Sequence, residues 1–268
     1  MGTGPHALND AARLSLGRTL RRGIRAWWDH LGLACALSAL WTIAVGIPTG
    51  LALQYATAAR GIVLALGLPV ALAIAAWVTA GIHRSAFQAI EGDEPGIAWV
   101  WRTDAALMRQ ALGLAFIQWV VTLGLALNIA FYLSLRSPLG LVLAVVFGYG
   151  MVFWLSACQY QWPLLTAGAM GLISRDDGSR PRLASVFRNA FILALGSPLY
   201  SLALGCIMLG LAVPLVVTGV GLVLVAPGLI AFLTSQSVRD HMVRFGMVAP
   251  PDEGGPVPDV WTVPKNET

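Results

Sequence analysis

Charged residues are scarce in this chain. Only 11% of its 268 residues are Asp, Glu, Lys or Arg, whereas 57% are hydrophobic. A soluble domain of ordinary composition carries about 25% charged residues. The scarcity therefore excludes an ordinary cytosolic globular protein.

Ionisable residues are also missing from the interior of the long apolar runs. All 13 acidic residues fall between the runs or in the terminal segments. The four histidines, His6, His30, His83 and His241, lie outside the runs or at their edges. Proton-coupled pumps and cation carriers place such groups inside their spans to carry the coupling charge. We therefore do not expect proton-driven transport.

Sequence patterns for metal binding and catalysis are absent as well. The three cysteines, Cys35, Cys158 and Cys206, show no C-x-x-C spacing and fit the role of small apolar side chains. There is no H-E-x-x-H, no G-x-S-x-G and no Walker loop. We predict a protein that is not an enzyme and that holds neither a metal nor a cofactor.

Apolar sequence, in contrast, is abundant. Runs of about 20 residues or more recur, and each is long enough to cross a hydrocarbon core of about 30 Å as a helix. No charged residue separates the last two crossings, so the turn between them is expected near 214–221. The fold class is predicted to be all-α, a polytopic membrane bundle of six helices. The predicted spans are 31–56, 61–82, 110–134, 138–161, 189–212 and 217–236.

The distribution of arginine sets the expected orientation. Of the 17 basic residues, all but Arg60 and Arg136 fall on one side of the six spans. The positive-inside rule then predicts a bacterial inner-membrane protein with both termini in the cytoplasm. The net charge of +4 is spread along one membrane face, which favours the lipid bilayer and not nucleic acid as the partner.

Segments of different character flank the membrane domain, which covers residues 31–237. Residues 1–30 place apolar positions such as Leu16 and Leu20 among arginines, as an amphipathic cytoplasmic helix does. That helix would lie on lipid headgroups or dock on a partner's helix. The tail, residues 238–268, is rich in proline and glycine beyond Val248 and is predicted to be disordered in the cytoplasm.

Charged or amphipathic segments precede the first, third and fifth spans. Arg25, Arg102 and Arg188 mark these three approaches. The arrangement suggests three repeats of an approach segment followed by a helical hairpin, although no residue pattern beyond hydrophobicity supports it.

Neutral polar residues form stripes on the fourth and fifth spans. Their spacing of seven and eleven residues places them on one helix face. They either hold helices together through hydrogen bonds, worth about 0.6 kcal/mol each in a bilayer, or line a pathway near carbonyls freed by a mid-span proline. The candidate polar pocket comprises Tyr149, Ser156, Tyr160, Asn189, Ser197, Pro198, Tyr200 and Ser201.

Four local motifs carry a resemblance to a known family. They are GIPTGLAL at 46–53, WVWRTDAALMRQALGL at 99–114, YQWPLL at 160–165 and FRNAFILALGSPL at 187–199. With them the chain resembles the bacterial YesL-like membrane proteins, the family of domain of unknown function 624. The resemblance implies a six-helix, non-enzymatic integral membrane protein, often associated with carbohydrate uptake systems of the ABC type.

Two functions follow from these observations. The first is an accessory protein that binds a subunit of a membrane transporter, with a carbohydrate permease as the expected partner. The alternative is a small permease or channel for a neutral solute, which would use the polar stripes of spans four and five. The sequence does not set the oligomeric state.

Overall fold

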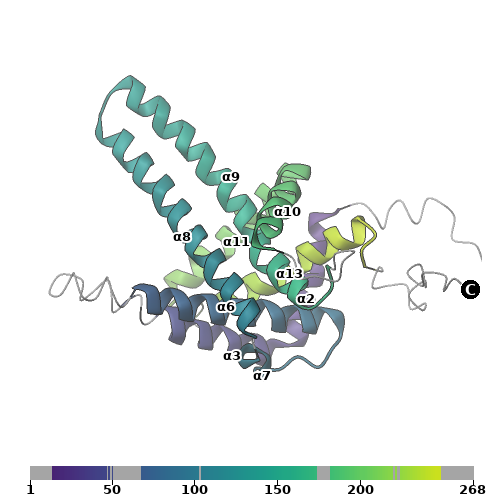
Figure 1. Cartoon of the computed structure of the whole chain (residues 1–268). Coiled ribbons are helices and arrows are strands. Elements are labelled where there is room, and N and C mark those ends of the chain that lie inside the picture. The colour runs from purple at the N-terminus through teal and green to yellow at the C-terminus, as the bar shows by residue number, and fades with distance from the viewer. Residues whose placement is uncertain are drawn as a thin grey trace, which may run out of the picture.

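The computed structural model is built from helices (Figure 1). Every regular element among the residues that the structure describes is helical, which confirms the all-α prediction. Residues 1–13 and most of the predicted tail lie outside the described part, as do portions of the first two predicted spans. The described residues are 14–46, 48, 50, 68–102, 104–173, 182–219, 221 and 224–248.

Within the described residues, four helices are long and apolar enough to cross a membrane, or five if a bent pair near the N-terminus counts as one crossing. The bent pair joins α2 (Leu16–Asp29) to α3 (Leu31–Trp41) and the π-helix η1 (Thr42–Gly46). Together they make this a membrane-embedded helical protein. The four long helices are α6 (Leu68–Glu91), α8 (Ala105–Ser134), α9 (Pro138–Ala169) and α11 (Pro198–Val217).

Helix α2 turns away from the helix that follows it. The chain bends by 90° at His30, so α2 and α3 do not form one straight span. Thr19 and Gly23 on α2 are buried, whereas Trp28 is 64% exposed. A Cβ on Gly23 would lie 2.9 Å from Leu233, because α2 packs closely on α13 (Ala226–Arg244).

Helices α8 and α9 form a long hairpin whose outer half projects from the rest of the molecule (Figure 1). Asp104 caps α8 by accepting a hydrogen bond from the backbone N–H of Leu107 at 2.7 Å. Ser137 caps α9, and Pro138 occupies its first turn. Apolar side chains cover the outer half, as bilayer contact requires; exposed ones include Leu127, Phe131, Leu139, Val142 and Val146.

The predicted fifth span, 189–212, is wrong as a single helix. Helix α10 (Leu183–Gly196) ends at Ser197, and α11 begins at Pro198. A proline disfavours helical geometry in the residue before it, and Ser197 is accordingly non-helical, with ψ at 64°. Helix α11 alone has 20 residues and is about 30 Å long, enough for one crossing.

The break at Ser197 lies at the end of a neighbouring helix. Arg244, the last residue of α13, donates a hydrogen bond from Nη1 to Ser197 Oγ at 3.0 Å. Counting residues from Arg188 instead places Ser197 near the middle of a span. In the structure Ser197 lies at the junction of two helices, α10 and α11.

Helix α13 is the central helix of the bundle. The predicted span 217–236 starts earlier and ends earlier than α13, which runs from Ala226 to Arg244. Nearly every side chain from Leu229 to Met242 is buried, although this stretch includes Thr234, Gln236 and Arg239. It packs against α2, α3, α6, α9 and α11. A polar helix is therefore shielded by more apolar neighbours.

Short approach helices precede three hairpins in the described chain. Helix α2 precedes α3 and α6, α7 (Ala98–Trp101) precedes α8 and α9, and α10 precedes α11 and α13. This order matches the three approach segments marked in the sequence by Arg25, Arg102 and Arg188.

Candidate functional site

The two stripes predicted to form one polar pocket separate in the structure. Tyr149 is 74% exposed on the outer half of α9. Ser156, farther along α9, donates its hydroxyl to the carbonyl of Val152 in its own helix at 2.8 Å. Neither residue contributes to an enclosed polar site.

The other candidates on α10 and at its junction with α11 also lie apart from a pocket. Asn189 is half-buried on α10. Ser197 accepts the bond from Arg244, and Pro198 is exposed at the start of α11. Ser197 and Pro198 therefore form the helix junction, and Asn189 lies within α10.

Three of the candidates do come together, in a buried group that we call the tyrosine cluster. Tyr160 on α9 and Ser201 on α11 are fully buried, with Tyr160 Oη and Ser201 Oγ 2.7 Å apart. Tyr200 donates toward Thr19 Oγ1 at 2.9 Å and Ser237 Oγ at 3.1 Å. These contacts join α2, α9, α11 and α13, so the cluster fastens helices together.

His241 of α13 completes the tyrosine cluster. The rings of Tyr160 and Tyr200 meet it edge-on, with centroids 5.5 and 5.4 Å away. Its Nδ1 donates to the carbonyl of Ser237 at 2.8 Å.

Charged residues beside the cluster are paired. Arg239 binds Glu91 of α6 through two hydrogen bonds, of 2.6 and 3.3 Å, and both side chains are largely buried. Asp240 accepts from Thr19 Oγ1 at 2.5 Å and from Gln236 Nε2 at 2.8 Å. These pairs offset the cost of burying charge and fix the end of α13 against α2 and α6.

A cavity of about 680 Å³ lies between α3, α6, α8, α9, α11 and α13. None of the eight residues predicted for the polar pocket lines it. Its size is within the range of about 300–1,000 Å³ typical of small-molecule sites. Small side chains such as Ala76 and Ala212 leave this space open.

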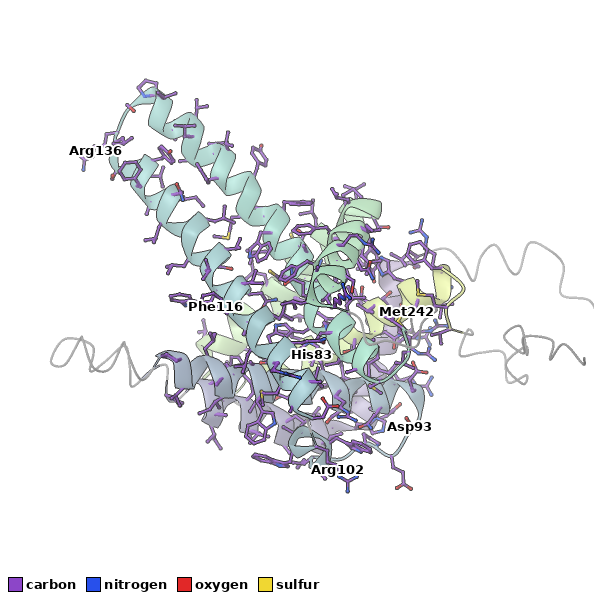
Figure 2. The ribbon with its side chains drawn as sticks, in the orientation of Figure 1. His83, Asp93, Arg102, Phe116, Arg136 and Met242 are labelled. Carbon is purple, nitrogen blue, oxygen red and sulfur yellow. The ribbon has the colours of Figure 1, made fainter. Side chains whose placement is uncertain are left out.

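His83 contributes a polar face to the cavity from α6 (Figure 2). The sequence placed it at the edge of a span, but only 7% of it is exposed. Its Nδ1 donates to the carbonyl of Thr79 at 3.0 Å, which leaves Nε2 as an acceptor 3.3 Å from Thr234 Oγ1. Both ring nitrogens therefore lie within hydrogen-bond distance of neighbouring groups in the bundle.

Indole and amide groups in the cavity wall bind one another. Trp41 Nε1 donates to Thr79 Oγ1 at 3.1 Å. Trp162 Nε1 donates to Gln118 Oε1 at 2.9 Å, and Gln118 Nε2 donates to Gln161 Oε1 at 2.7 Å. These hydrogen bonds fix the shape of the wall. Gln161, which supports the wall without lining it, keeps a buried Nε2 that has no hydrogen-bond partner among the described residues.

The side-chain amide of Gln159 is only partly hydrogen-bonded. Its Nε2 donates to the carbonyls of Ser156 and Ser201, at 2.9 and 3.0 Å. Its Oε1 is buried and has no hydrogen-bond partner among the described residues. Other atoms of Gln159 line the cavity, and Oε1 itself is covered by neighbouring protein atoms.

The cavity lining carries no formal charge. No Asp, Glu, Lys or Arg belongs to the wall formed by the described residues, and the same part of the chain contains no group of three metal-ligating side chains. Moving a charged molecule into such a site would cost its hydration without a paired charge in return. The arrangement is suited to holding an uncharged molecule.

No family model, curated protein or solved structure matches this chain. The function is therefore inferred from the geometry of the cavity and the helices around it.

The cavity residues escaped the sequence prediction for a physical reason. They come from six separate elements, and helical spacing relates residues only within one helix. A weaker signal was present: Gln118, Gln159 and Gln161 are amides inside apolar runs, where each polar group needs a partner. Pairing them would have directed attention to this part of α8 and α9.

Proposed function

We propose that this chain binds an uncharged small molecule within the membrane and acts as a small permease for it. The observation that carries the proposal is the cavity of about 680 Å³, which has no charged residue among its described lining. Of the two functions expected from the sequence, the neutral-solute permease is the one that this geometry favours. It uses the cavity instead of the polar stripes.

We also propose six crossings with both termini in the cytoplasm of a bacterial cell. Helices α3, α6, α8, α9, α11 and α13 would be the crossings, with α2, α7 and α10 on the cytoplasmic side. Helix directions support this topology, because α6 runs parallel to α13 and α3 runs antiparallel to it. The contacts that give these directions are His83–Thr234, Glu91–Arg239, His30–Phe232 and Gly228–Ser38.

Flux through reconstituted protein tests the permease. Liposomes that contain the full chain are expected to swell faster than empty liposomes in gradients of glycerol-like or sugar solutes. Ala212→Phe, which places a large ring in the cavity, is expected to remove that excess flux. Leu209→Phe on the exposed face of the same helix serves as the matched control. Equal flux with and without protein for every neutral solute would contradict the permease.

Our second proposal is an accessory role beside a transporter. We also retain, as part of this proposal, the resemblance to the YesL-like family. The exposed apolar outer half of the α8–α9 hairpin favours it, because the helices of a transporter subunit can pack there as readily as lipid does. The proposed partner is a carbohydrate permease of the ABC type. We retain the prediction that the chain is not an enzyme.

Affinity purification from native membranes in mild detergent tests the accessory role. A transporter subunit is expected to copurify with the chain, and Val142→Arg on the hairpin is expected to release it. Arg21→Ala on α2 provides a surface control away from the hairpin. Recovery of the chain alone from cells that express the transporter would contradict this role.

A further inference from the structure

We propose that the outward face of α2 binds the headgroups of anionic phospholipids. The inference uses the proposed crossing of α3 and does not depend on the permease. Three features of α2 carry it: its direction, the exposed arginines on its surface and the apolar side chains beside them.

Helix α2 is held across the end of the bundle. The chain bends by 90° between α2 and α3, so α2 runs along the membrane surface when α3 crosses the bilayer. The inner face of α2 is already occupied by α13, where Thr19 Oγ1 donates to Asp240 and Gly23 is buried. A partner from outside the chain therefore meets only the opposite face.

That opposite face carries exposed positive charge. Arg21 and Arg25 are both exposed and lie one helical turn apart. Arg25 is 3.8 Å from Asp29, and both of these side chains remain largely exposed. Arg21 forms no ion pair within the described part of the chain. Two guanidinium groups at this spacing can contact the phosphate oxygens of neighbouring lipids.

Apolar side chains on the same face favour a lipid surface over an acidic soluble protein. Ile24 and Trp28 are 44% and 64% exposed. Together with Arg21 and Arg25 they follow the i, i+3, i+4, i+7 spacing of one helix face. Tryptophan is enriched at the depth of the headgroups, and an arginine beside it can bury its alkyl stem there while its charge reaches the phosphates. The face thus matches the headgroup layer in both charge and polarity.

A second approach helix repeats this combination of residues. Ile97 and Trp101, at the two ends of α7, are 43% and 53% exposed. The guanidinium groups of Arg84 and Arg102 lie 5.0 and 5.1 Å from the ring centroid of Trp99. Figure 2 shows Arg102 at the edge of the bundle. Exposed tryptophan beside arginine is therefore shared by two of the three approach helices.

The net charge of the headgroup decides which lipid is preferred. Phosphatidylcholine carries a cationic amine next to its phosphate, whereas phosphatidylglycerol carries only the negative charge. One arginine near an anionic surface strengthens association about fivefold. The two exposed arginines of α2 then predict a preference for phosphatidylglycerol of about five- to thirtyfold.

Fluorescence quenching in proteoliposomes measures this preference. The full chain, with its three native cysteines replaced by alanine, carries a coumarin at Gly17→Cys, where a new Cβ meets nothing within 4 Å. Phosphatidylglycerol and phosphatidylcholine, each with a nitroxide on the same acyl carbon, are compared as quenchers in phosphatidylcholine vesicles. We expect the predicted preference at low salt, and we expect it to shrink as salt is added.

Three pairs of substitutions assign the preference to α2. Arg21→Gln with Arg25→Gln should bring the ratio of the two association constants close to one. Arg21→Lys with Arg25→Lys keeps the charge and should retain most of the preference. Arg182→Gln with Arg188→Gln removes the same charge from exposed positions before and on α10, and should leave the ratio unchanged. Thermal unfolding in the same vesicles verifies that each variant is folded.

The outcomes separate this inference from the proposed function. Equal association of the two lipids with the parent chain would overturn it. A preference that survives Arg21→Gln with Arg25→Gln, or that falls equally in the α10 pair, would overturn the assignment to α2. None of these four arginines belongs to the described lining of the cavity, so solute flux tests the permease independently of these results.

Discussion

Buried polar side chains hold this apolar protein together at particular points. Tyr160 meets Ser201, Tyr200 meets Thr19 and Ser237, and each pair joins two different helices. In a bilayer, packing and such hydrogen bonds replace the hydrophobic drive that assembles a soluble core. The sequence allowed Tyr160 and Tyr200 either to hold helices together or to line a pathway, and in the structure both hydroxyl groups make contacts between helices.

Gly228 permits the close approach of α13 to α3. A Cβ there would lie 2.7 Å from the carbonyl oxygen of Ala34 and from Ser38 Oγ. We expect Gly228→Ala to destabilise the fold by about 1–3 kcal/mol, because backbone must move to relieve the overlap. Gly210→Ala on α11 meets nothing within 4 Å and should be neutral or slightly stabilising. Thermal unfolding in detergent measures both, and equal melting temperatures would contradict the packing.

At the scale of elements, proline and glycine govern where helices end. Ser137 and Pro138 start α9 at the residue where the sequence placed the fourth span. The same type of signal, Gly196-Ser197-Pro198, ends α10, yet counting apolar residues treated it as the interior of a span. The apolar run after Arg188 is longer than one crossing needs because it contains parts of two helices, α10 and α11. No charged residue between Arg188 and Pro198 marks where one helix ends and the next begins.

Pro198 should be tolerant of replacement. It occupies the first position of α11, where its missing N–H would have no helical partner in any case. We expect Pro198→Ala to change the unfolding free energy by no more than about 0.5 kcal/mol, and to leave flux unchanged. Urea or thermal unfolding of the purified variant measures this. A change of several kcal/mol would indicate a proline inside a continuous helix and contradict the break at Ser197.

Helix α13 shows why the remaining elements were harder to predict. Hydropathy finds helices that face lipid, and α13 faces other helices along most of its length. Its buried Arg239 is matched by Glu91, which lies 148 positions earlier in the chain. Tertiary partners of this kind decide both its position and the shape of the cavity, and no pattern within one segment encodes them.

The whole molecule combines a compact bundle with a projecting hairpin. Figure 2 places Arg136 at the tip of the hairpin and Asp93 on the opposite side of the bundle. With six crossings, the tip faces outside and the loop that contains Asp93 faces the cytoplasm. The cavity then lies between them, at the base of the hairpin.

Cysteine labelling in intact cells tests that topology. In a chain whose three native cysteines are replaced by alanine, Arg136→Cys should react with a membrane-impermeant maleimide added from outside. Asp93→Cys should react only after the inner membrane is permeabilised. Reaction of both positions from outside, or of Asp93→Cys alone, would contradict the six crossings and the cytoplasmic termini.

The cavity is expected to retain an uncharged molecule through purification. Mass spectrometry of solvent extracts measures this on chain purified in mild detergent as wild type, Ala212→Phe and Leu209→Phe. We predict that at least one neutral compound is retained in near-stoichiometric amount by the wild type and by Leu209→Phe, and is lost from Ala212→Phe. The same compounds in equal amounts from all three proteins would contradict the claim.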